Sequence, residues 1–511
     1  MTLEMFQLLS PELILLLTGL VVLIVDLAWL EKTPSADEAS PADEASPGGK
    51  KEIWVPVLAL IGLGAALVAT ILLWGKPPTI VMGIAALDPF ALFFKVIATV
   101  SVMLVIMASI SYLRGRTRYR GEFYALLVFT ALAISLASAS VNLISLYLAM
   151  EFLSITSYVL AGYLRDNLKS NEAGIKYFLY GAVTSAAMLY GMSLLYGATG
   201  TTDLAQIARV LAISADSVQW LAAAAIVLLL AGFGFKIVLA PFHQWAPDTY
   251  EGAPTPMTAF LSVGSKAAGF AILMRVFLMA LPAFRWNIGW MAFLMALSII
   301  SMALGNLIAL RQSNIKRMLA YSSIGQAGYI IIGIICLNLN VESAFLGVNG
   351  TLFYLFAYLF TNLAVFTGVI AFETATGSSE IEDYRGLVKR SPVLAGVMLI
   401  GLLSLAGIPG TGGFLAKFFV FGAAIQFNTT QTLILALVGV ITSAIAAFYY
   451  LNVVRYMFFE PAEEEAQAIV VPTWQKVGLA VTAVAILAIG LYPQPFLEFA
   501  TQSIQMVGMA F

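Results

Sequence analysis

The sequence predicts an all-α membrane protein that crosses the bilayer many times. Of its 511 residues, 61% are hydrophobic and only 11% are charged, whereas a soluble domain carries about 25% charged residues. The apolar residues form runs of roughly 20 residues or more, long enough to cross a hydrocarbon core of about 30 Å as a helix. These runs do not alternate between apolar and polar residues, as the strands of an outer-membrane barrel would.

The apolar runs correspond to about 14 spans. They cover residues 11–30, 54–74, 89–113, 122–140, 142–164, 172–197, 219–240, 256–280, 288–310, 314–336, 344–375, 392–421, 430–458 and 474–496. No positively charged region precedes the first span, so we expect it to be a retained helix and not a cleaved signal peptide.

The spans group into four expected parts. These are residues 1–121 with spans 1–3, 122–280 with spans 4–8, 281–458 with spans 9–13, and 459–511 with span 14. The first part contains a linker over 31–53 with the tandem repeat ADEASPADEASP at 36–47. Because this segment is polar and cannot bury a core, the sequence predicts that it is disordered.

The distribution of basic residues predicts the orientation in the membrane. The loops after even-numbered spans hold only Lys76, Arg209 and Arg285, whereas those after odd-numbered spans hold the other loop lysines and arginines. Since cytoplasmic loops carry the excess of basic residues, both termini are expected outside and the Arg114–Arg120 loop in the cytoplasm.

Composition also limits the chemistry of this chain. It has one cysteine, Cys336, and one histidine, His243. These cannot form an intrachain disulfide, a structural zinc site, a haem site or an Fe–S site. We therefore expect no cofactor in this chain, and any redox chemistry would belong to another chain. The net charge of −2 offers no basic surface for nucleic acid.

Ionisable residues inside the spans are the candidate functional residues, because a charge at the centre of a membrane helix costs at least about 2.5 kcal/mol. Glu151 lies near the middle of the fifth span without another charge within a turn. It is either half of a structural ion pair or a proton-relay carboxylate, and Lys236 is its expected partner. Lys95 and Arg275 also fall within spans, although Lys95 lies close enough to the outer end to snorkel.

Lys236 lies in the stretch GFGFKIVLAPFHQW, where Gly232 and Gly234 precede it and Pro241 follows. The glycines are expected to let other backbone approach, and the proline to break the seventh span. Broken helices at membrane depth mark ion sites in transporters. Burial disfavours the charged form of a lysine, so a proton-exchanging role is favoured over a lysine that snorkels to the cytoplasmic surface.

The next candidates follow closely along the chain. Lys266 lies about ten residues into the eighth span among small residues, where snorkelling is difficult, so a relay role is favoured. His243 follows the break, and an unperturbed pKa near 6.5 suits proton uptake, but a lone histidine is as often simply a hydrogen-bonding residue. Asp248 and Glu251 form either a proton-collecting mouth or a solvated loop.

A second lysine next to a break occurs in the twelfth span. Lys417 follows the stretch GIPGTGG at 407–413. The seventh and twelfth spans cross in opposite directions, because they are an odd number of spans apart. Two such broken helices predict an inverted repeat of spans 4–8 and 9–13.

Five stretches carry a resemblance to a known family. They are YLAMEFLSITSYVLAGY (147–163), SNEAGIKYFLYGAVTSAAMLYG (170–191), KIVLAPFHQWAPDTYEGAPTPMTAFLSVGSKAAGF (236–270), RQSNIKRMLAYSSIGQAGY (311–329) and GIPGTGGFLAKF (407–418). Together they resemble the antiporter-like membrane subunits of respiratory complex I, the proton-pumping NADH:quinone oxidoreductase. A lysine in the twelfth span, and no histidine early in the eleventh, favour the N type (subunit 2) over the L and M types.

The resemblance implies a fold of 14 helices with two inverted five-helix repeats. It implies that Glu151 and Lys236 pair, that Lys266 is the central residue, and that Lys417 leads toward the exit. It also implies partners, which are neighbouring antiporter-like and small membrane subunits and a peripheral redox arm that carries flavin, Fe–S clusters, NADH and quinone. The expected location is a bacterial plasma membrane, with a thylakoid membrane as the alternative.

Three other functions stay open at this stage. The chain is alternatively a subunit of a multi-subunit cation/proton antiporter, a stand-alone solute transporter, or a structural membrane scaffold. The series of ionisable residues argues against the scaffold, and the absence of a bulky polar pocket signature argues against the solute transporter. Between complex I and the antiporter, only the resemblance decides.

The repeated linker segment gives a first testable prediction. Deletion of residues 36–47 should leave assembly and turnover nearly unchanged, because the segment contains no apolar residue larger than alanine. The amount of assembled complex in membranes and its quinone-reductase rate measure this. A strong assembly defect would instead show that the segment docks on a neighbouring subunit.

Overall fold

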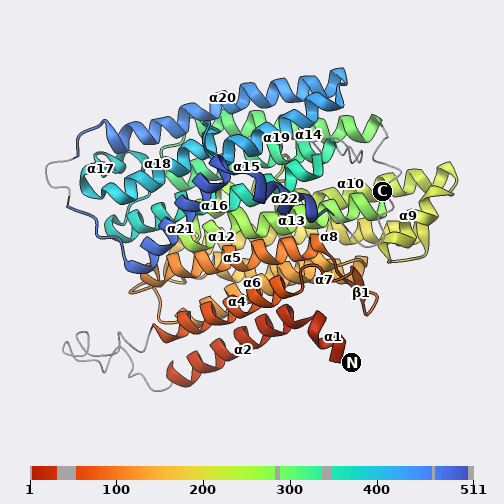
Figure 1. Ribbon diagram of the computed structural model, residues 1–511, viewed down its shortest axis with the longest axis horizontal. Helices are drawn as coiled ribbons and strands as arrows, with labels where there is room; N and C mark the ends of the chain where they lie inside the picture. Colours follow the sequence, from red (N-terminus) through yellow and green to blue (C-terminus); the bar gives the residue numbers. More distant parts are fainter. Residues whose placement is uncertain (1–2, 31–52, 282–287, 337–346, 463–466, 505–511) are drawn as a thin grey trace.

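The computed structural model describes residues 3–30, 53–281, 288–336, 347–462 and 467–504. In these ranges the chain is a bundle of long helices that run roughly parallel to one axis (Figure 1). The linker over 31–53, for which the sequence predicts disorder, lies outside the described residues except for Ile53, so that expectation stays a prediction.

The helices of the first half include seven long ones and three short ones. They are α1 (Leu3–Leu8), α2 (Ser10–Leu30), α4 (Trp54–Leu72), α5 (Pro89–Tyr112), α6 (Arg120–Ala139), α7 (Leu143–Ala161), α8 (Leu168–Thr199), α9 (Leu204–Ala212), α10 (Asp216–Ile237) and α11 (Ala246–Gly252). The sequence did not predict a small antiparallel hairpin between α4 and α5, formed by β1 (Thr79–Val81) and β2 (Ala85–Leu87).

One continuous helical segment follows, in which α-helix and π-helix alternate. It consists of α12 (Thr255–Phe260), π-helix η1 (Leu261–Ser265), α13 (Lys266–Arg275) and π-helix η2 (Val276–Ala280). π-Helical turns are rare and often mark functional sites. Here one of them ends immediately before Lys266.

The helices of the second half complete the bundle. They are α14 (Ile288–Ala309), α15 (Ile315–Ile335), α16 (Gly347–Thr376), η4 (Ile381–Tyr384), α17 (Leu387–Arg390), α18 (Pro392–Ala406), α19 (Gly412–Phe427), α20 (Thr430–Phe458), α21 (Thr473–Leu491) and α22 (Gln494–Gln502). Helix α22 is separate from α21, although the sequence predicted one span over 474–496.

The structure confirms the all-α membrane fold class and the break in the twelfth span. Among the described residues, 13 helices are long and apolar enough to cross a membrane. Helices α18 and α19, with 15 and 16 residues, occupy the predicted twelfth span and are separated by a turn. The total of 14 crossings and the inverted repeats stay predictions.

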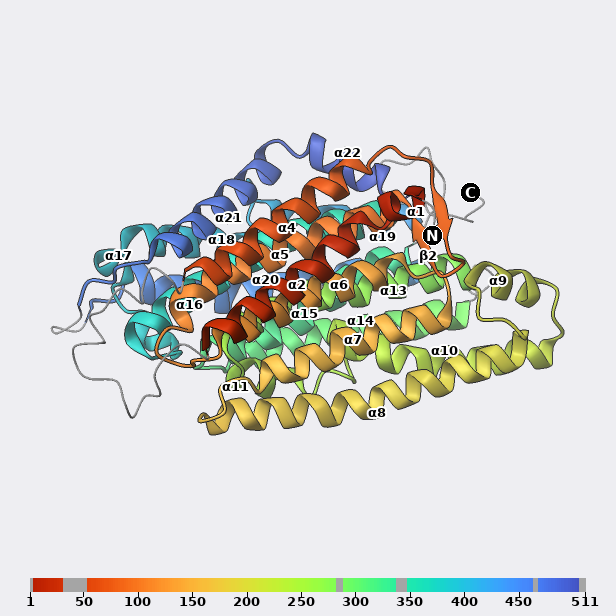
Figure 2. The same ribbon diagram turned by 90° about the horizontal axis from the view of Figure 1, so that it is seen from below.

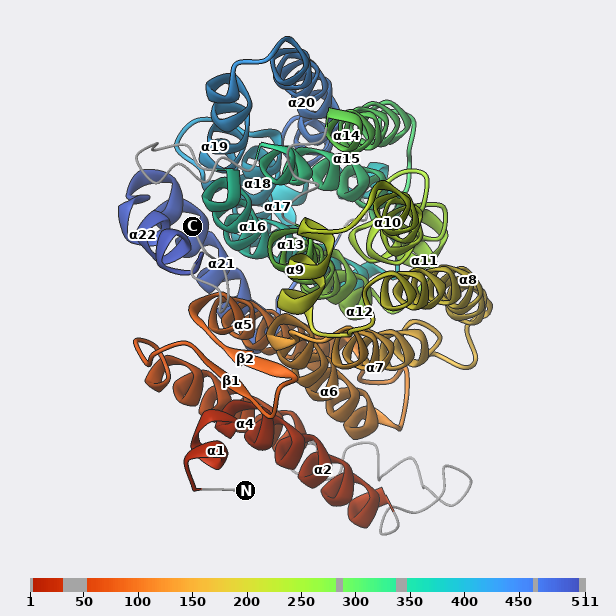
Figure 3. The same ribbon diagram turned by 90° about the vertical axis from the view of Figure 1, so that its right-hand side faces the viewer.

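The bundle has a buried interior and a lipid-exposed periphery. Viewed along the helices, α13 and α16 lie inside, while α2, α4 and α20 lie at the outside (Figure 3). Helix α8 forms one edge, alongside α7 and α10 (Figure 2). In the most apolar 18-residue stretch of 255–280, 100% of the residues are buried, whereas in that of 168–199 only 28% are buried. The segment that carries Lys266 is therefore shielded on all sides by protein.

Two buried ion pairs connect the first helices to the interior. Arg275 donates to both carboxylate oxygens of Asp88, at 2.6 and 3.0 Å, and to the Ser138 carbonyl oxygen. Lys95 Nζ lies 2.5 Å from Glu12 Oε1, which also accepts from Ser135. Lys95 therefore does not snorkel to the surface, as its position in the sequence had allowed, because it has an acidic partner inside the bundle.

The Asp88–Arg275 pair gives a test of the packing. Asp88→Ala leaves the Arg275 guanidinium fully buried without its carboxylate, which costs about 3–5 kcal/mol. We expect much less chain in membranes and a lower thermal stability of the extracted complex.

The exposed Asp166 provides the matched control, because Asp166→Ala should leave both quantities unchanged. A normal amount of the Asp88→Ala chain, with normal stability, would show that the pair does not hold α5 to α13.

Candidate functional site

Five described lysines are buried, and three of them, apart from Lys95 with its partner Glu12 and Lys316 at the start of α15, lie deep within the spans. Lys236 on α10 is 2% exposed, Lys266 on α13 is fully buried, and Lys417 on α19 is 5% exposed. None of them forms an ion pair with a described carboxylate. The three differ in hydrogen bonding, which increases from Lys236 to Lys417.

Lys236 lies in an aromatic surrounding at the end of α10. Its Nζ lies 5.8–6.0 Å from the ring centroids of Tyr158, Tyr177 and Phe235, at the limit of a cation–π contact. No described group accepts a hydrogen bond from it. The hydroxyl of Tyr177 and that of the nearby Ser157 are also without partners in the described chain.

The helix break after Lys236 follows from local sequence. Helix α10 ends at Ile237, and the indole of Trp245 donates to the Phe235 carbonyl oxygen at 3.2 Å. Of the two glycines expected to admit backbone, Gly232 packs against the side chain of Met188 and Gly234 against that of Phe242. The glycines therefore make room for side chains and not for backbone.

Glu151 lies on α7 and faces α8. Its Oε1 accepts a hydrogen bond from the Ser185 hydroxyl, and Ser185 is also within 3.3 Å of the Tyr147 hydroxyl. Glu151 interacts electrostatically with Lys236, but the two described side chains do not form a direct ion pair. The proposed Glu151–Lys236 pair is thus a coupling through space, and its role stays a prediction.

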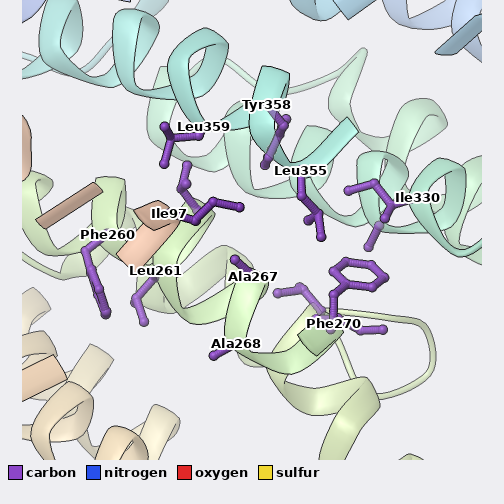
Figure 4. Close-up of a cluster of buried hydrophobic side chains, with 14 of the residues drawn as sticks. Ile97, Phe260, Leu261, Ala267, Ala268, Phe270, Ile330, Leu355, Tyr358 and Leu359 are labelled. Carbon is purple, nitrogen blue, oxygen red and sulfur yellow. The ribbon is translucent and has the colours of Figure 1, made fainter. Parts of the chain in front are cut away.

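Lys266 is held by a single residue of α15. Its Nζ donates to both the carbonyl oxygen and the hydroxyl of Ser323, each at 2.5 Å. The Nζ also lies 5.4 Å from the ring centroid of Tyr358 on α16. The neighbouring Ala267 belongs to a cluster of buried hydrophobic side chains that also includes Leu355 and Tyr358 of α16 (Figure 4). Lys266 therefore has one polar contact in an otherwise apolar core.

Lys417 occupies the break of the twelfth span. Its Nζ donates to the carbonyl oxygens of Leu405 and Ala406, at 2.9 and 3.0 Å, and to the Ser443 hydroxyl at 2.8 Å. All three donors of an ammonium group are thereby used. The two carbonyls belong to the C-terminal end of α18, which carries the negative end of the helix dipole. Gly407, at φ +85°, leaves space for the lysine, whose Cδ would lie 3.0 Å from an added Cβ.

Polar side chains connect the surroundings of Lys266 and Lys417. The Tyr358 hydroxyl contacts Ser323 Oγ at 3.5 Å, and Gln326 donates to the Leu405 carbonyl oxygen at 3.4 Å. Tyr358, Gln326 and Lys417 line one cavity of about 10 Å³, which is the size needed for about one water molecule.

His243 lies beyond the break, outside the spans, and is half-buried. Burial lowers the pKa of the His243 imidazole below its ordinary value. No described group bonds to its Nδ1. The proposed proton uptake by His243 stays a prediction.

Asp248 and Glu251 on α11 belong to an ordered ion-pair network. Asp248 accepts from Lys176 at 2.5 Å and from Arg317 at 2.7 Å, and Glu251 accepts from Lys169 at 3.0 Å and from Arg317 at 3.1 Å. Burial alone would raise the pKa of both carboxyls, but these basic partners outweigh it and lower the pKa of each. The segment is therefore tied to α8 and α15 and is not a loose loop.

Sequence reasoning missed one buried cluster near α11. Lys316, assigned to a loop from the sequence, is 5% exposed and donates to the Ala253 carbonyl oxygen and the Thr255 hydroxyl, each at 3.2 Å. Thr255 in turn bonds to Glu373, which also accepts from Tyr112. One sequence feature could have revealed that Lys316 is buried. Lys316 and Ser323 are seven residues apart, a spacing that places both on the same face of α15.

Metal binding has no support in the described residues. Among them, no group of three or more His, Cys, Asp or Glu side chains is arranged to hold a metal ion. Titratable groups buried in membrane helices, joined by hydroxyl and amide groups around a water-sized cavity, are typical of a membrane protein that moves ions.

Comparison with known proteins identifies the family to which this membrane protein belongs. The sequence model of the NADH:quinone oxidoreductase/Mrp antiporter transmembrane family matches residues 140–446, which contain Glu151, Lys236, Lys266 and Lys417. The chain therefore belongs to this family. Its similarity extends beyond the matched region to nearly the full length of individual relatives.

Two curated relatives and one solved structure show how far the similarity extends. The chain is 39% identical to NADH-quinone oxidoreductase subunit N of Trichlorobacter lovleyi, over 97% of this chain and 96% of that one. It is also 39% identical to NAD(P)H-quinone oxidoreductase subunit 2 of Thermosynechococcus vestitus, over 97% and 92%. A chain of respiratory complex I from Thermus thermophilus with bound aureothin matches at TM-score 0.76 and 32% identity, over 96% and 98%. The resemblance to the complex I family and its N type is confirmed.

The contacts of Lys417 give the prediction for this site. Lys417→Arg keeps a positive charge, but the guanidinium is planar and stays charged at all physiological pH values. A guanidinium cannot donate three hydrogen bonds from one nitrogen, as the Lys417 ammonium group does, and it cannot release a proton. Proton pumping by the assembled complex should therefore fall strongly. Proton uptake by inverted membrane vesicles measures this.

The exposed Lys389 is the matched control, and Lys389→Arg should pump normally. Unimpaired pumping by Lys417→Arg would show that a fixed positive charge suffices at the break.

Proposed function

We propose that the chain is a proton-translocating membrane subunit of NADH:quinone oxidoreductase, complex I. In this proposal it moves protons through a Glu/Lys relay that is coupled to quinone reduction on other subunits. The observation that carries the proposal is the series of three membrane-buried lysines, none paired with a described carboxylate and each bonded differently. The 39% identity to subunit N over nearly the whole chain supports it.

The relay works because each lysine exists in two protonation states of similar free energy. Burial penalises the ammonium form, while nearby acceptors and negative charges stabilise it. Lys236 has no described hydrogen-bond acceptor, so its charged form depends on the field of Glu151. Lys417, with three acceptors, holds a proton without a carboxylate. A proton passes from one lysine to the next through hydroxyl groups and water.

Electrostatic coupling connects the titratable residues of the relay. At an effective dielectric constant of about 20, two unit charges about 8 Å apart interact by about 2 kcal/mol. This exceeds the roughly 1.4 kcal/mol that shifts a protonation equilibrium tenfold. A change in the charge near Glu151 therefore alters the occupancy of Lys236, and each later lysine responds to the one before it.

The redox chemistry belongs to partner subunits in this proposal. Flavin, Fe–S clusters, NADH and quinone would be bound there, and neighbouring antiporter-like and small membrane subunits would flank this chain. The matched chain from Thermus thermophilus is part of respiratory complex I, which supports an assembly of this kind. This chain would contribute to the enzyme as a translocase subunit.

Two alternatives have less support. The family also includes Mrp antiporter chains, but the relatives named above, with 32–39% identity, are oxidoreductase subunits or a complex I chain. A solute transporter needs a ligand cavity of roughly 300–1,000 Å³. The cavity beside Lys417 is about 10 Å³, so this cavity does not provide such a site.

Orientation and host membrane complete the proposal. The excess of basic residues in alternate loops supports both termini outside and α11 on the cytoplasmic side. A bacterial plasma membrane is favoured, and the similarity to a cyanobacterial subunit 2 keeps the thylakoid membrane as the alternative. The relation of spans 4–8 to spans 9–13 by an inverted repeat is part of the same proposal.

The direct test is the replacement of single titratable residues of the relay in the intact complex. Glu151→Ala and Lys266→Ala should each lower the number of protons moved per electron while the complex still assembles, because each removes one titratable group from the relay. Proton translocation and quinone reduction are measured together in inverted membrane vesicles.

Two exposed residues provide matched controls. Glu498 and Lys389 are solvent-accessible, so Glu498→Ala and Lys389→Ala should leave the ratio unchanged. Normal pumping by both Glu151→Ala and Lys266→Ala would refute the relay. Loss of assembly with normal pumping in the residual complex would assign Glu151 to structure only.

A further inference from the structure

Three side chains from three different helices meet at the hydroxyl of Ser323. Lys266 Nζ of α13 lies 2.5 Å from Ser323 Oγ, the Tyr250 hydroxyl of α11 lies at 3.4 Å, and the Tyr358 hydroxyl of α16 lies at 3.5 Å. All four side chains are almost fully buried. Ser323 is therefore a junction of polar groups in a region that is otherwise apolar.

The hydrogen-bonding capacity of a serine hydroxyl matches these three partners completely. A hydroxyl has one proton to donate and two lone pairs to accept with. When Lys266 is charged it can only donate, so Ser323 Oγ accepts from Lys266 and from Tyr358 and donates its own proton to Tyr250. No lone pair and no proton is then left over.

Loss of the Lys266 proton reverses two of these bonds. A neutral amine has a lone pair, so Ser323 donates to Lys266 and accepts from Tyr250, while Tyr358 continues to donate. The capacity of Ser323 is again filled. The two arrangements differ only in the direction of the bonds along the line from Tyr250 through Ser323 to Lys266.

A row of hydrogen bonds whose directions can reverse in this way can pass a proton along it and is called a proton wire. If the Tyr250 proton moves to Ser323 Oγ while the Ser323 proton moves to Lys266 Nζ, the first arrangement results from the second. In the same concerted step, a hydronium ion of the water phase at the α11 side supplies the proton that replaces the one Tyr250 gave up. No charged intermediate forms on either hydroxyl, and the only net change is one more proton on Lys266.

Tyr250 belongs to α11, the helix whose carboxylates lie at the charged end of the bundle. Tyr250 stands on α11 between Asp248 and Glu251, which contact Lys176, Lys169 and Arg317 at the charged end of the bundle. Tyr358 points to the other side, since it lines the cavity that also contains Lys417. The line through Tyr250 thus leads to Lys266 from the charged end.

We propose that Tyr250 and Ser323 form the proton wire that loads Lys266 from the α11 side, and that Tyr358 is a positioning residue for Ser323. The proposal rests on the relay function proposed above and adds its route of proton uptake. Burial raises the pKa of the Tyr250 hydroxyl, opposed by the hydrogen bond from Ser323. This favours a concerted transfer over a tyrosinate intermediate.

The experiment removes single hydroxyl groups from the intact complex. Tyr250→Phe and Ser323→Ala should each slow proton pumping by roughly tenfold or more, the scale of a lost proton-transfer group. Ser323→Thr keeps a hydroxyl and should restore most of the pumping. The rate in the two slow variants should also fall further in D2O than the rate of the unchanged complex, because proton transfer has become limiting.

Ser101 provides the matched control for the loss of a buried hydroxyl. It is fully buried on α5, and its hydroxyl donates to the Ala98 carbonyl oxygen of its own helix at 2.9 Å. Ser101→Ala should pump like the unchanged complex and should show its D2O effect.

The outcomes separate this proposal from the relay itself. Normal pumping by Tyr250→Phe, together with loss of pumping by Lys266→Ala, overturns the wire and leaves the relay standing. Normal pumping by Lys266→Ala overturns both. If Ser323→Ala does not assemble, Tyr250→Phe decides. Failure of an assembled Ser323→Thr complex to pump overturns the role of the hydroxyl.

Discussion

The cost of placing a charge where water is excluded governs the arrangement of this protein. An ionised side chain in a membrane interior must find its partners within the protein. The chain solves this in two ways. Asp88 and Arg275 neutralise one another with two hydrogen bonds and additional support from the Ser138 carbonyl oxygen. Lys236, Lys266 and Lys417 have no such carboxylate partner among the described residues, and neutral carbonyl and hydroxyl oxygens accept hydrogen bonds from Lys266 and Lys417.

This difference divides the buried charges by function. A guanidinium stays protonated at every physiological pH, so the Arg275 pair serves as a fixed connection between α5 and α13. A lysine supported only by carbonyl and hydroxyl oxygens keeps both of its protonation states within reach. The break between α18 and α19 supplies such oxygens at the position of Lys417, because the last carbonyls of a helix have no partner within the helix. The interruption of the helix is thus the means by which Lys417 is bound without a counter-charge.

The sequence alone was sufficient for the all-α membrane fold class and for locating four ionisable residues, Glu151, Lys236, Lys266 and Lys417, within long apolar segments, whereas the role of these residues stays a prediction. Those features depend on composition and on the length of apolar runs, which are local properties. The sequence could not place Lys95 in contact with Glu12, since these residues lie on different helices and meet only through helix packing. For the same reason it missed Lys316, which looked like a loop residue, and Ser323, whose importance comes entirely from what the neighbouring helices bring to it.

Serine and tyrosine hydroxyls are well suited to link lysines because a hydroxyl both donates and accepts. Ammonium groups in a row can only donate hydrogen bonds, so they cannot pass a proton directly from one to the next. Carboxylates in their place would form ion pairs with the lysines and hold them in the protonated form. Ser323, Tyr250 and Tyr358 instead offer exchangeable hydrogen bonds without a net charge. In the proposed relay, the lysines set where a proton rests, and the hydroxyls set the route by which it arrives. This separation explains why the residues between the lysines are neutral and polar, as Gln326 and Tyr354 also are, in an interior that otherwise selects apolar side chains.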